Sequence, residues 1–225
     1  MIKFDHVTKK FSDGTISLND VSFEINDGEF VFLVGPSGAG KTTIFRRILR
    51  NLQPNEGEIL VDEHNLKKIS DGKVTQLRKK IGCVFQDLKL LPDRSILENV
   101  ALSLWVLGKN AKEIEIESRE KLDMVGLGTK ADFFPTQLSG GELQRAAIAR
   151  ALAGDPKYIL ADEPTGNVDD ENGWKIVEIL EKINDNGTTV VMATHNPEIV
   201  DKLGKRVVRL KEGKITSDKK GKYRE

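Results

Sequence analysis

The fold of this chain is decided by Phe30-Val-Phe-Leu-Val-Gly35-Pro-Ser-Gly-Ala-Gly40-Lys41-Thr42-Thr43. Its first five residues form a short apolar run, which is typical of a strand buried on both faces. A glycine-rich turn follows, and the residues from Ile44 to Leu49 then have helical spacing. The stretch therefore predicts a strand, a turn and a helix in direct succession.

The turn carries the pattern G-x-x-x-x-G-K-[ST], which binds phosphate chains where it joins a strand to a helix. Its glycines let backbone N–H groups surround a phosphate without a Cβ in the way, and the helix N-terminus adds positive potential. We expect Lys41 to reach the β- and γ-phosphates and Thr42 to offer its hydroxyl to Mg²⁺. The dinucleotide pattern G-x-G-x-x-G is absent. The predicted phosphate site comprises Gly35, Pro36, Ser37, Gly38, Ala39, Gly40, Lys41, Thr42 and Thr43.

Composition limits the class of protein. The 225 residues suffice for one large α/β domain or two small ones. Lysine plus arginine and aspartate plus glutamate both total 35, so the net charge is zero and we expect no nucleic-acid partner. The single cysteine, Cys83, excludes an intrachain disulfide and a cysteine-built metal site, which favours a reduced, cytoplasmic setting. We find no signal-peptide core and no apolar run near the roughly 18 residues that cross a bilayer, so we expect a soluble protein.

The order of elements predicts an α/β fold. Strands are expected at 2–7, 21–25, 30–34, 58–62, 81–85, 158–161 and 188–193. Helices are expected at 73–80, 96–123 with a break at 108–110, 143–153 and 173–184. A hairpin is predicted at 206–215, followed by a charged, frayed tail from Thr216. This pattern predicts a mainly parallel sheet core with an N-terminal antiparallel β portion and a helical insertion.

Two adjacent carboxylates, Asp162 and Glu163, follow the apolar strand at 158–161. Such a pair is costly at the end of a parallel strand unless something uses it, because like charges repel and lose solvation. One interpretation gives Asp162 a place in the Mg²⁺ shell and lets Glu163 activate or orient an attacking water. The alternative is a helix N-cap with a solvated acid beside it.

A second anion-binding nest is predicted at Leu138-Ser-Gly-Gly-Glu142, directly before a helix. Ser139, Gly140 and Gly141 expose backbone amides at the N-terminus of that helix. The phosphate chain of one nucleotide already has its own loop. A second nest therefore needs another explanation.

Together, the glycine-rich loop, the 138–142 segment and the 162–163 pair resemble the ABC ATPases. In that family the signature segment, here Ser139, Gly140, Gly141 and Glu142, closes on the γ-phosphate held by the partner subunit, so that a head-to-tail dimer encloses two ATP molecules. The resemblance implies a single nucleotide-binding domain over 1–225, with a core at 1–86 and 158–225 and a helical subdomain at 87–157.

The resemblance also implies roles for single residues. Gln86 matches the glutamine that senses Mg²⁺ and the membrane partner, and His195 matches the histidine at the γ-phosphate. Asp169 matches the D-loop aspartate at the dimer interface, and Phe11 takes the place of the aromatic residue that stacks on the base. ATP and Mg²⁺ are the implied ligands, and Glu163, His195, Gln86 and Lys41 the implied catalytic residues.

Within the family, the segment Leu90–Val100 and the opening MIKFDHVTKKF resemble the bacterial cell-division branch. This implies an integral membrane partner that docks near Gln86 and residues 87–105, at the cytoplasmic face of the cell membrane and at the division site. Subunits for lipoprotein release or macrolide export share Glu163–Asn167 and remain an alternative, as does a scaffold gated by nucleotide binding. Departures from the common pattern occur at Ser103, Leu143 and Val168, and none removes a catalytic group.

Overall fold

The computed structural model describes residues 1–223, and the chain divides into two compact units. The first unit consists of Met1–Arg78 together with the segment that starts at Thr189. The second unit is Lys79–Thr188. The glycine-rich stretch thus belongs to the first unit, while the 138–142 segment and the 162–163 pair belong to the second.

The first unit contains an antiparallel sheet in which the strands follow the order β2-β1-β4-β5. Ile2, Phe4 and Val7 of β1 are buried, with a register shift between Phe4 and Val7, and the stacked rings of Phe4 and Phe23, with centroids 4.8 Å apart, join β1 to β2. The predicted N-terminal antiparallel portion is confirmed, with longer strands than expected. The strands are β1 (Ile2–Lys10), β2 (Ile16–Ile25), β4 (Glu56–Val61) and β5 (His64–Asn65).

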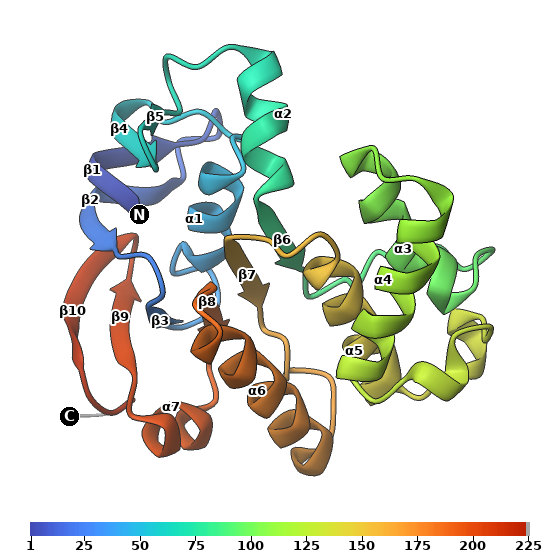
Figure 1. Ribbon diagram of the computed structural model, residues 1–225. Helices are drawn as coiled ribbons and strands as arrows, with labels where there is room; N and C mark the ends of the chain where they lie inside the picture. The colour runs from blue at the N-terminus through green and yellow to red at the C-terminus, as the bar shows by residue number, and fades with distance from the viewer. Residues whose placement is uncertain (224–225) are drawn as a thin grey trace. The chain divides into compact units, whose positions relative to one another are not determined.

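A second sheet of the same unit is built around β3 (Phe30–Val34), whose five residues are all buried. β3 lies between two parallel neighbours, β8 (Thr189–Thr194) and β9 (Arg206–Lys211). The register pairs Val34 with Thr194 of β8 and with Arg209 of β9. The predicted parallel core is therefore confirmed, and it places the carboxyl ends of these strands at one edge (Figure 1).

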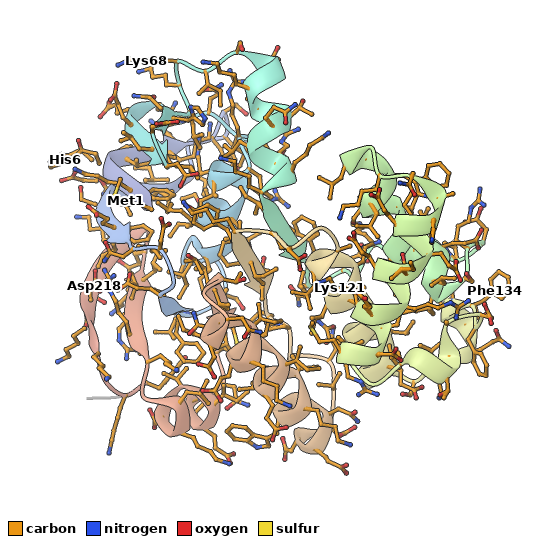
Figure 2. The ribbon with its side chains drawn as sticks, viewed as in Figure 1. Met1, His6, Lys68, Lys121, Phe134 and Asp218 are labelled. Carbon is orange, nitrogen blue, oxygen red and sulfur yellow. The ribbon has the colours of Figure 1, made fainter. Side chains whose placement is uncertain are left out.

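The C-terminal segment differs from the prediction of a frayed tail. Residues Lys214–Lys220 form strand β10, which pairs antiparallel with β9 as far as Lys220 opposite Arg206. The Arg206 guanidinium also binds the carboxylate of Asp218, which is labelled in Figure 2. An edge strand pairs with a neighbouring strand on one side only, and charged side chains are common there because they block pairing with another chain. The lysines of this edge strand therefore led to the wrong prediction of a frayed tail.

Three helices complete the first unit. Helix α1 (Lys41–Ile48) follows the glycine-rich turn, and α2 (Asp71–Lys79) begins close to the predicted basic helix. Helix α7 (Pro197–Leu203) is capped by the side chain of Asn196, which accepts from the backbone N–H groups of Glu198 and Ile199. Helix α1 is thereby the one that starts directly at the predicted phosphate site.

The second unit combines a parallel strand pair with a group of helices. β6 (Ile81–Val84) pairs with β7 (Tyr158–Asp162), and α3, α4 and α5 pack against one another (Figure 1). Gly108, in the left-handed region at φ 83°, ends α3 inside the predicted break. The helices are α3 (Ile96–Leu107), α4 (Ala111–Met124), α5 (Gly140–Leu152) and α6 (Asp170–Asp185), with 3₁₀ turns η1 (Gly128–Lys130) and η2 (Pro135–Gln137). Between residues 1 and 223, none of the helices has the length and apolar character needed to cross a membrane.

Candidate active site

The glycine-rich turn leaves β3 and enters α1 with no room for side chains at two points. A Cβ on Gly35 would lie 2.2 Å from the carbonyl oxygen of Leu210. A Cβ on Gly40, whose φ is +111°, would lie 2.6 Å from the carbonyl oxygen of Ser17. Both positions therefore require glycine. The loop between them exposes Pro36, Ser37 and Gly38 to solvent, as a phosphate-binding backbone must.

The side chain of Lys41 folds back over this loop. It is 8% exposed, and its Nζ donates to the carbonyl oxygen of Gly35 at 2.7 Å. Thr42, next along α1, is exposed, while Thr43 shares a 2.6 Å hydrogen bond with Ser17 Oγ. An ammonium group held among loop carbonyls, beside the N-terminus of a helix, fits a polyanionic ligand.

His195 lies at the same sheet edge as the glycine-rich turn. Val34 and Thr194 are register partners on parallel strands, so Gly35 and His195 are the next residues on neighbouring strands. His195 is exposed, and the turn that carries it is closed by a 3.1 Å hydrogen bond from the Asn196 N–H to Thr194 Oγ1. The structure thus brings two sequence-predicted elements together in the first unit.

Phe11 lies in the loop between β1 and β2. Its N–H donates to the carbonyl oxygen of Thr15 at 2.8 Å, its ring is partly exposed, and Lys9 Nζ lies 5.3 Å from the ring centroid. β2 begins directly after this loop, and its residue Ser17 contacts the first turn of α1. Stacking of Phe11 on a base stays a prediction.

In the second unit, parallel pairing likewise brings Gln86 and the acidic pair to one edge. Val84 of β6 is the register partner of Ala161 of β7, so residues 85–86 and 162–163 leave neighbouring strand ends. Gln86 is exposed, whereas Asp162 is 6% exposed and closes β7. The three polar groups thereby occupy the position in which parallel α/β sheets bind ligands.

Glu163 has an uncommon backbone conformation. Its φ of 51° lies in the left-handed region, which few residues other than glycine adopt. Its carbonyl oxygen accepts from the N–H of Gly166 at 3.1 Å, which closes the turn after β7. The alternative that the 162–163 pair caps a helix is wrong, because α6 begins at Asp170 and has Asp169 as its N-cap.

The segment Ser139–Glu142 forms a capping box at the start of α5. The Glu142 carboxylate accepts from the Ser139 N–H at 3.0 Å and from its hydroxyl at 3.1 Å, and the Glu142 N–H donates to Ser139 Oγ. Lys130 binds the same carboxylate. The pKa of Glu142 is lowered to about 2, mainly by the hydrogen bond from Lys130 and next by that from the Ser139 N–H. The S-x-x-E spacing is the sequence signal for this box, whereas nothing in the sequence pointed to Lys130.

Replacing Lys130 with methionine should therefore destabilise the protein at neutral pH, by about 0.5–1 kcal/mol for a partly exposed pair. Because the folded-state pKa of Glu142 lies below its unfolded value, the stabilisation is complete above about pH 4.5 and is lost as the pH falls toward 2. Urea unfolding at pH 7 and near pH 4 should show a larger difference at pH 7. Lys112→Met, at an exposed position of α4, is the control. A difference between Lys130→Met and wild type that grows on acidification would contradict this account.

Asp169 lies at the N-terminus of α6, where the backbone N–H of Asn172 donates to its Oδ1 at 2.9 Å. Asn172 in turn contacts Arg145 and Gly141 of α5. Sequence reasoning missed Asn172 and Arg145. The contact between α5 and α6 depends on tertiary packing, which the sequence does not reveal. Its only local sign is the position of Asn172, three residues after the helix-capping Asp169.

Each unit offers oxygen atoms of the kind that Mg²⁺ binds. Within residues 1–223, no three His, Cys, Asp or Glu side chains are grouped so as to hold a metal by themselves. Mg²⁺ usually needs no such cage, because it is held by one or two protein oxygens together with substrate phosphates and water. The Thr42 hydroxyl, the Asp162 carboxylate and the Gln86 amide oxygen are donors of this kind.

Comparison with known proteins agrees with this geometry. Residues 18–166 match the family model described as ABC transporter. The chain therefore belongs to the ABC transporter family and is one of its ATP-binding and ATP-hydrolysing subunits.

Individual relatives indicate which branch of this family the chain resembles. The chain is 46% identical to the cell division ATP-binding protein FtsE of Streptococcus pneumoniae, over 99% of this chain and 97% of that protein. It is 47% identical to FtsE of Bacillus subtilis, over 99% and 98%. Among solved structures, the ATP-binding cassette MJ0796, a dimer in a post-hydrolysis state bound to ADP and Pi, superimposes with a TM-score of 0.90 at 39% identity, covering 98% of both chains.

Proposed function

We propose that this chain is the ATPase subunit of a membrane complex that acts in cell division, working as a single nucleotide-binding domain. The observation that carries the proposal is its 46–47% identity to FtsE proteins along nearly the whole of both chains. The chain would lie at the cytoplasmic face of the cell membrane, held there by an integral membrane partner of the FtsX type. ATP hydrolysis would drive that partner rather than the transport of a solute.

In this proposal ATP binds first to the glycine-rich loop of the first unit. The backbone N–H groups of residues 35–43 surround its phosphates, and Lys41 exchanges the carbonyl of Gly35 for the β- and γ-phosphates. The ring of Phe11 stacks on the base. Because the loop needs no side chain at Gly35 or Gly40, its backbone can approach the phosphates closely.

Glu163 then removes a proton from the attacking water or orients it for in-line attack on the γ-phosphate. Lys41 and His195 stabilise the charge that develops on the transferred phosphoryl group. Thr42, Gln86 and Asp162 would supply oxygen ligands to Mg²⁺, which would neutralise phosphate charge. The position of Glu163 directly after Asp162, at the carboxyl end of β7, supports this role.

The signature segment has its function in a dimer. Ser139, Gly140, Gly141 and Glu142 of one subunit close over the γ-phosphate bound to the other, and Asp169 lies at the same interface. A two-fold dimer contains two such composite sites. The Ser139 hydroxyl, which donates to Glu142 in the single chain, is the group that would turn to the phosphate. The relative MJ0796 forms a dimer with ADP and Pi, which supports this arrangement.

The membrane partner would dock beside Gln86 and residues 87–105, where α3 has an exposed apolar face. Leu102, Trp105 and Val106 follow helical spacing, and Trp105 and Val106 are 62% and 65% exposed. Exposed apolar side chains grouped on one helix face are typical of interaction sites. Trp105, as a large aromatic residue, is the expected anchor.

A pull-down tests both the partner and the surface. Membranes of the native cell are incubated with ATP and the Glu163→Gln protein, and the bound membrane protein is identified by mass spectrometry. We expect an FtsX-type protein, and we expect Trp105→Glu to abolish its capture. Ile116→Glu, which changes an exposed apolar residue on the neighbouring helix α4, is the matched control and should leave capture unchanged.

The outcomes separate the candidate functions. A substrate-translocating permease as the captured partner would move the function to export or lipoprotein release and leave the ATPase chemistry intact. Capture that survives Trp105→Glu would reject the docking surface on α3. An FtsX-type partner with a wild-type protein that binds ATP but does not hydrolyse it would favour a nucleotide-gated scaffold.

A further inference from the structure

The side chain of Asn172 joins two segments that the proposed mechanism treats separately. Its Oδ1 accepts from Arg145 Nη1 at 2.8 Å, which ties it to the signature helix α5. Its Nδ2 donates to Asp169 Oδ2 at 2.7 Å, and its backbone N–H donates to Asp169 Oδ1 at 2.9 Å. Both oxygens of the Asp169 carboxylate are thus held by one residue.

The same side chain packs on the signature backbone. A Cβ on Gly141 would lie 2.6 Å from Asn172 Cγ and 2.7 Å from its Oδ1, distances at which no side chain fits. A Cβ on Gly140 would lie 3.6 Å from the carbonyl oxygen of Asn167, in the segment before Asp169. Gly141 is buried although its neighbour Gly140 is exposed. The second glycine of the signature is therefore required by the contact with Asn172.

We propose that Asn172 is a positioning residue that holds the signature segment and the D-loop aspartate, Asp169, as one rigid element. The inference rests on the function proposed above, in which both segments act on the nucleotide of the partner subunit. A movement of α5 would then move Asp169 with it. The two segments would close on the nucleotide together rather than one after the other.

The charges explain why an amide suits this position. Arg145 and Asp169 carry opposite charges, and the Asn172 amide lies between them with its oxygen toward the cation and an N–H toward the anion. The orientation of the amide is therefore fixed, and charged partners make both hydrogen bonds stronger than neutral ones. A carboxylate of the same shape would keep the bond to Arg145 and repel Asp169. Consistently, the hydrogen bonds from Asn172 lower the pKa of Asp169.

Two isosteric variants test the proposal in the full chain. Asn172→Asp removes only the side-chain hydrogen bond to Asp169, and Asn172→Leu removes both side-chain hydrogen bonds while keeping a similar shape; the backbone hydrogen bond to Asp169 remains in each variant. We expect each to lower kcat for ATP by about 10- to 100-fold, as small displacements of catalytic groups do. ATP-induced dimer in the Glu163→Gln background should fall in parallel. The Kd of a fluorescent ATP analogue should stay within about twofold of wild type, since the loop that binds it belongs to the other unit.

Glu171→Gln is the matched control, because it changes an exposed carboxylate on the preceding residue of α6. It should leave kcat and dimerisation unchanged. The proposal is overturned if kcat of both Asn172 variants stays within twofold of wild type. It is also overturned if nucleotide affinity and thermal stability collapse together with kcat, since Asn172 would then serve folding alone. Normal turnover by Glu163→Gln would instead reject the proposed mechanism, whatever the Asn172 variants do.

Discussion

Replacing Glu163 with glutamine is expected to lower the rate of ATP hydrolysis by about 10²- to 10⁴-fold, the usual contribution of a general base. Glutamine keeps the size of the side chain and one hydrogen-bonding oxygen, but its neutral amide cannot accept the proton of the attacking water. ATP affinity should be retained, because the loop that contains Lys41 belongs to the other unit. Phosphate release at saturating ATP gives the rate, and size-exclusion chromatography with ATP shows whether a nucleotide-bound dimer accumulates.

The control for this change is Glu178→Gln, at an exposed position of α6 in the same unit. It makes the same chemical replacement away from the strand ends and should turn over at the wild-type rate. A Glu163→Gln protein with a rate near wild type would remove Glu163 from the mechanism. If turnover is lost together with ATP binding, the change has disturbed the fold and Glu163→Asp, which keeps the carboxylate, becomes the deciding variant.

The sequence predicted the fold well wherever a buried strand leads into polar residues. β3, β7 and β8 were recognised because each is an uninterrupted apolar run, and such runs indicate strands of a parallel sheet. Within the first unit, Lys41 and His195 come after β3 and β8, and within the second unit Asp162 ends β7, so each lies at the carboxyl end of a parallel strand. The position of these residues at strand ends could therefore be predicted before any register was known.

Contacts that depend on strand register or on packing between helices could not be predicted from the sequence. The bonds of Asn172 to Arg145 and Asp169 join residues 27 and three positions apart, and only the shorter one has a local pattern. Lys130, which binds Glu142, is the last residue of the 3₁₀ turn η1, and hydrophobic periodicity does not indicate such a short turn. These residues support the site from outside, and their identity follows from the tertiary structure rather than from the sequence around them.

Arg47 is a residue that neither the fold nor the proposed chemistry explains. It lies on the buried face of α1 and is 1% exposed. None of its guanidinium nitrogens finds a hydrogen-bond partner among residues 1–223. Burial lowers its pKa to about 10, so the group remains charged at neutral pH. A buried charge without a partner is strongly unfavourable, and apolar side chains surround this position on the helix at Ile44 and Ile48.

Replacing Arg47 with methionine, which has a similar length and no charge, should therefore stabilise the protein by about 1–4 kcal/mol. In a chain of this size each kcal/mol corresponds to about 2–4 °C in Tm, so thermal unfolding and urea titration should both show the gain. Arg46→Met is the matched control, because Arg46 is the preceding residue of α1 and is exposed; its effect should stay within about 0.5 kcal/mol. If Arg47→Met is less stable than wild type while Arg46→Met is neutral, the guanidinium makes a favourable interaction in solution and is not an unpaired charge. An equal gain in both variants would instead assign the effect to the overall charge of the protein and not to burial.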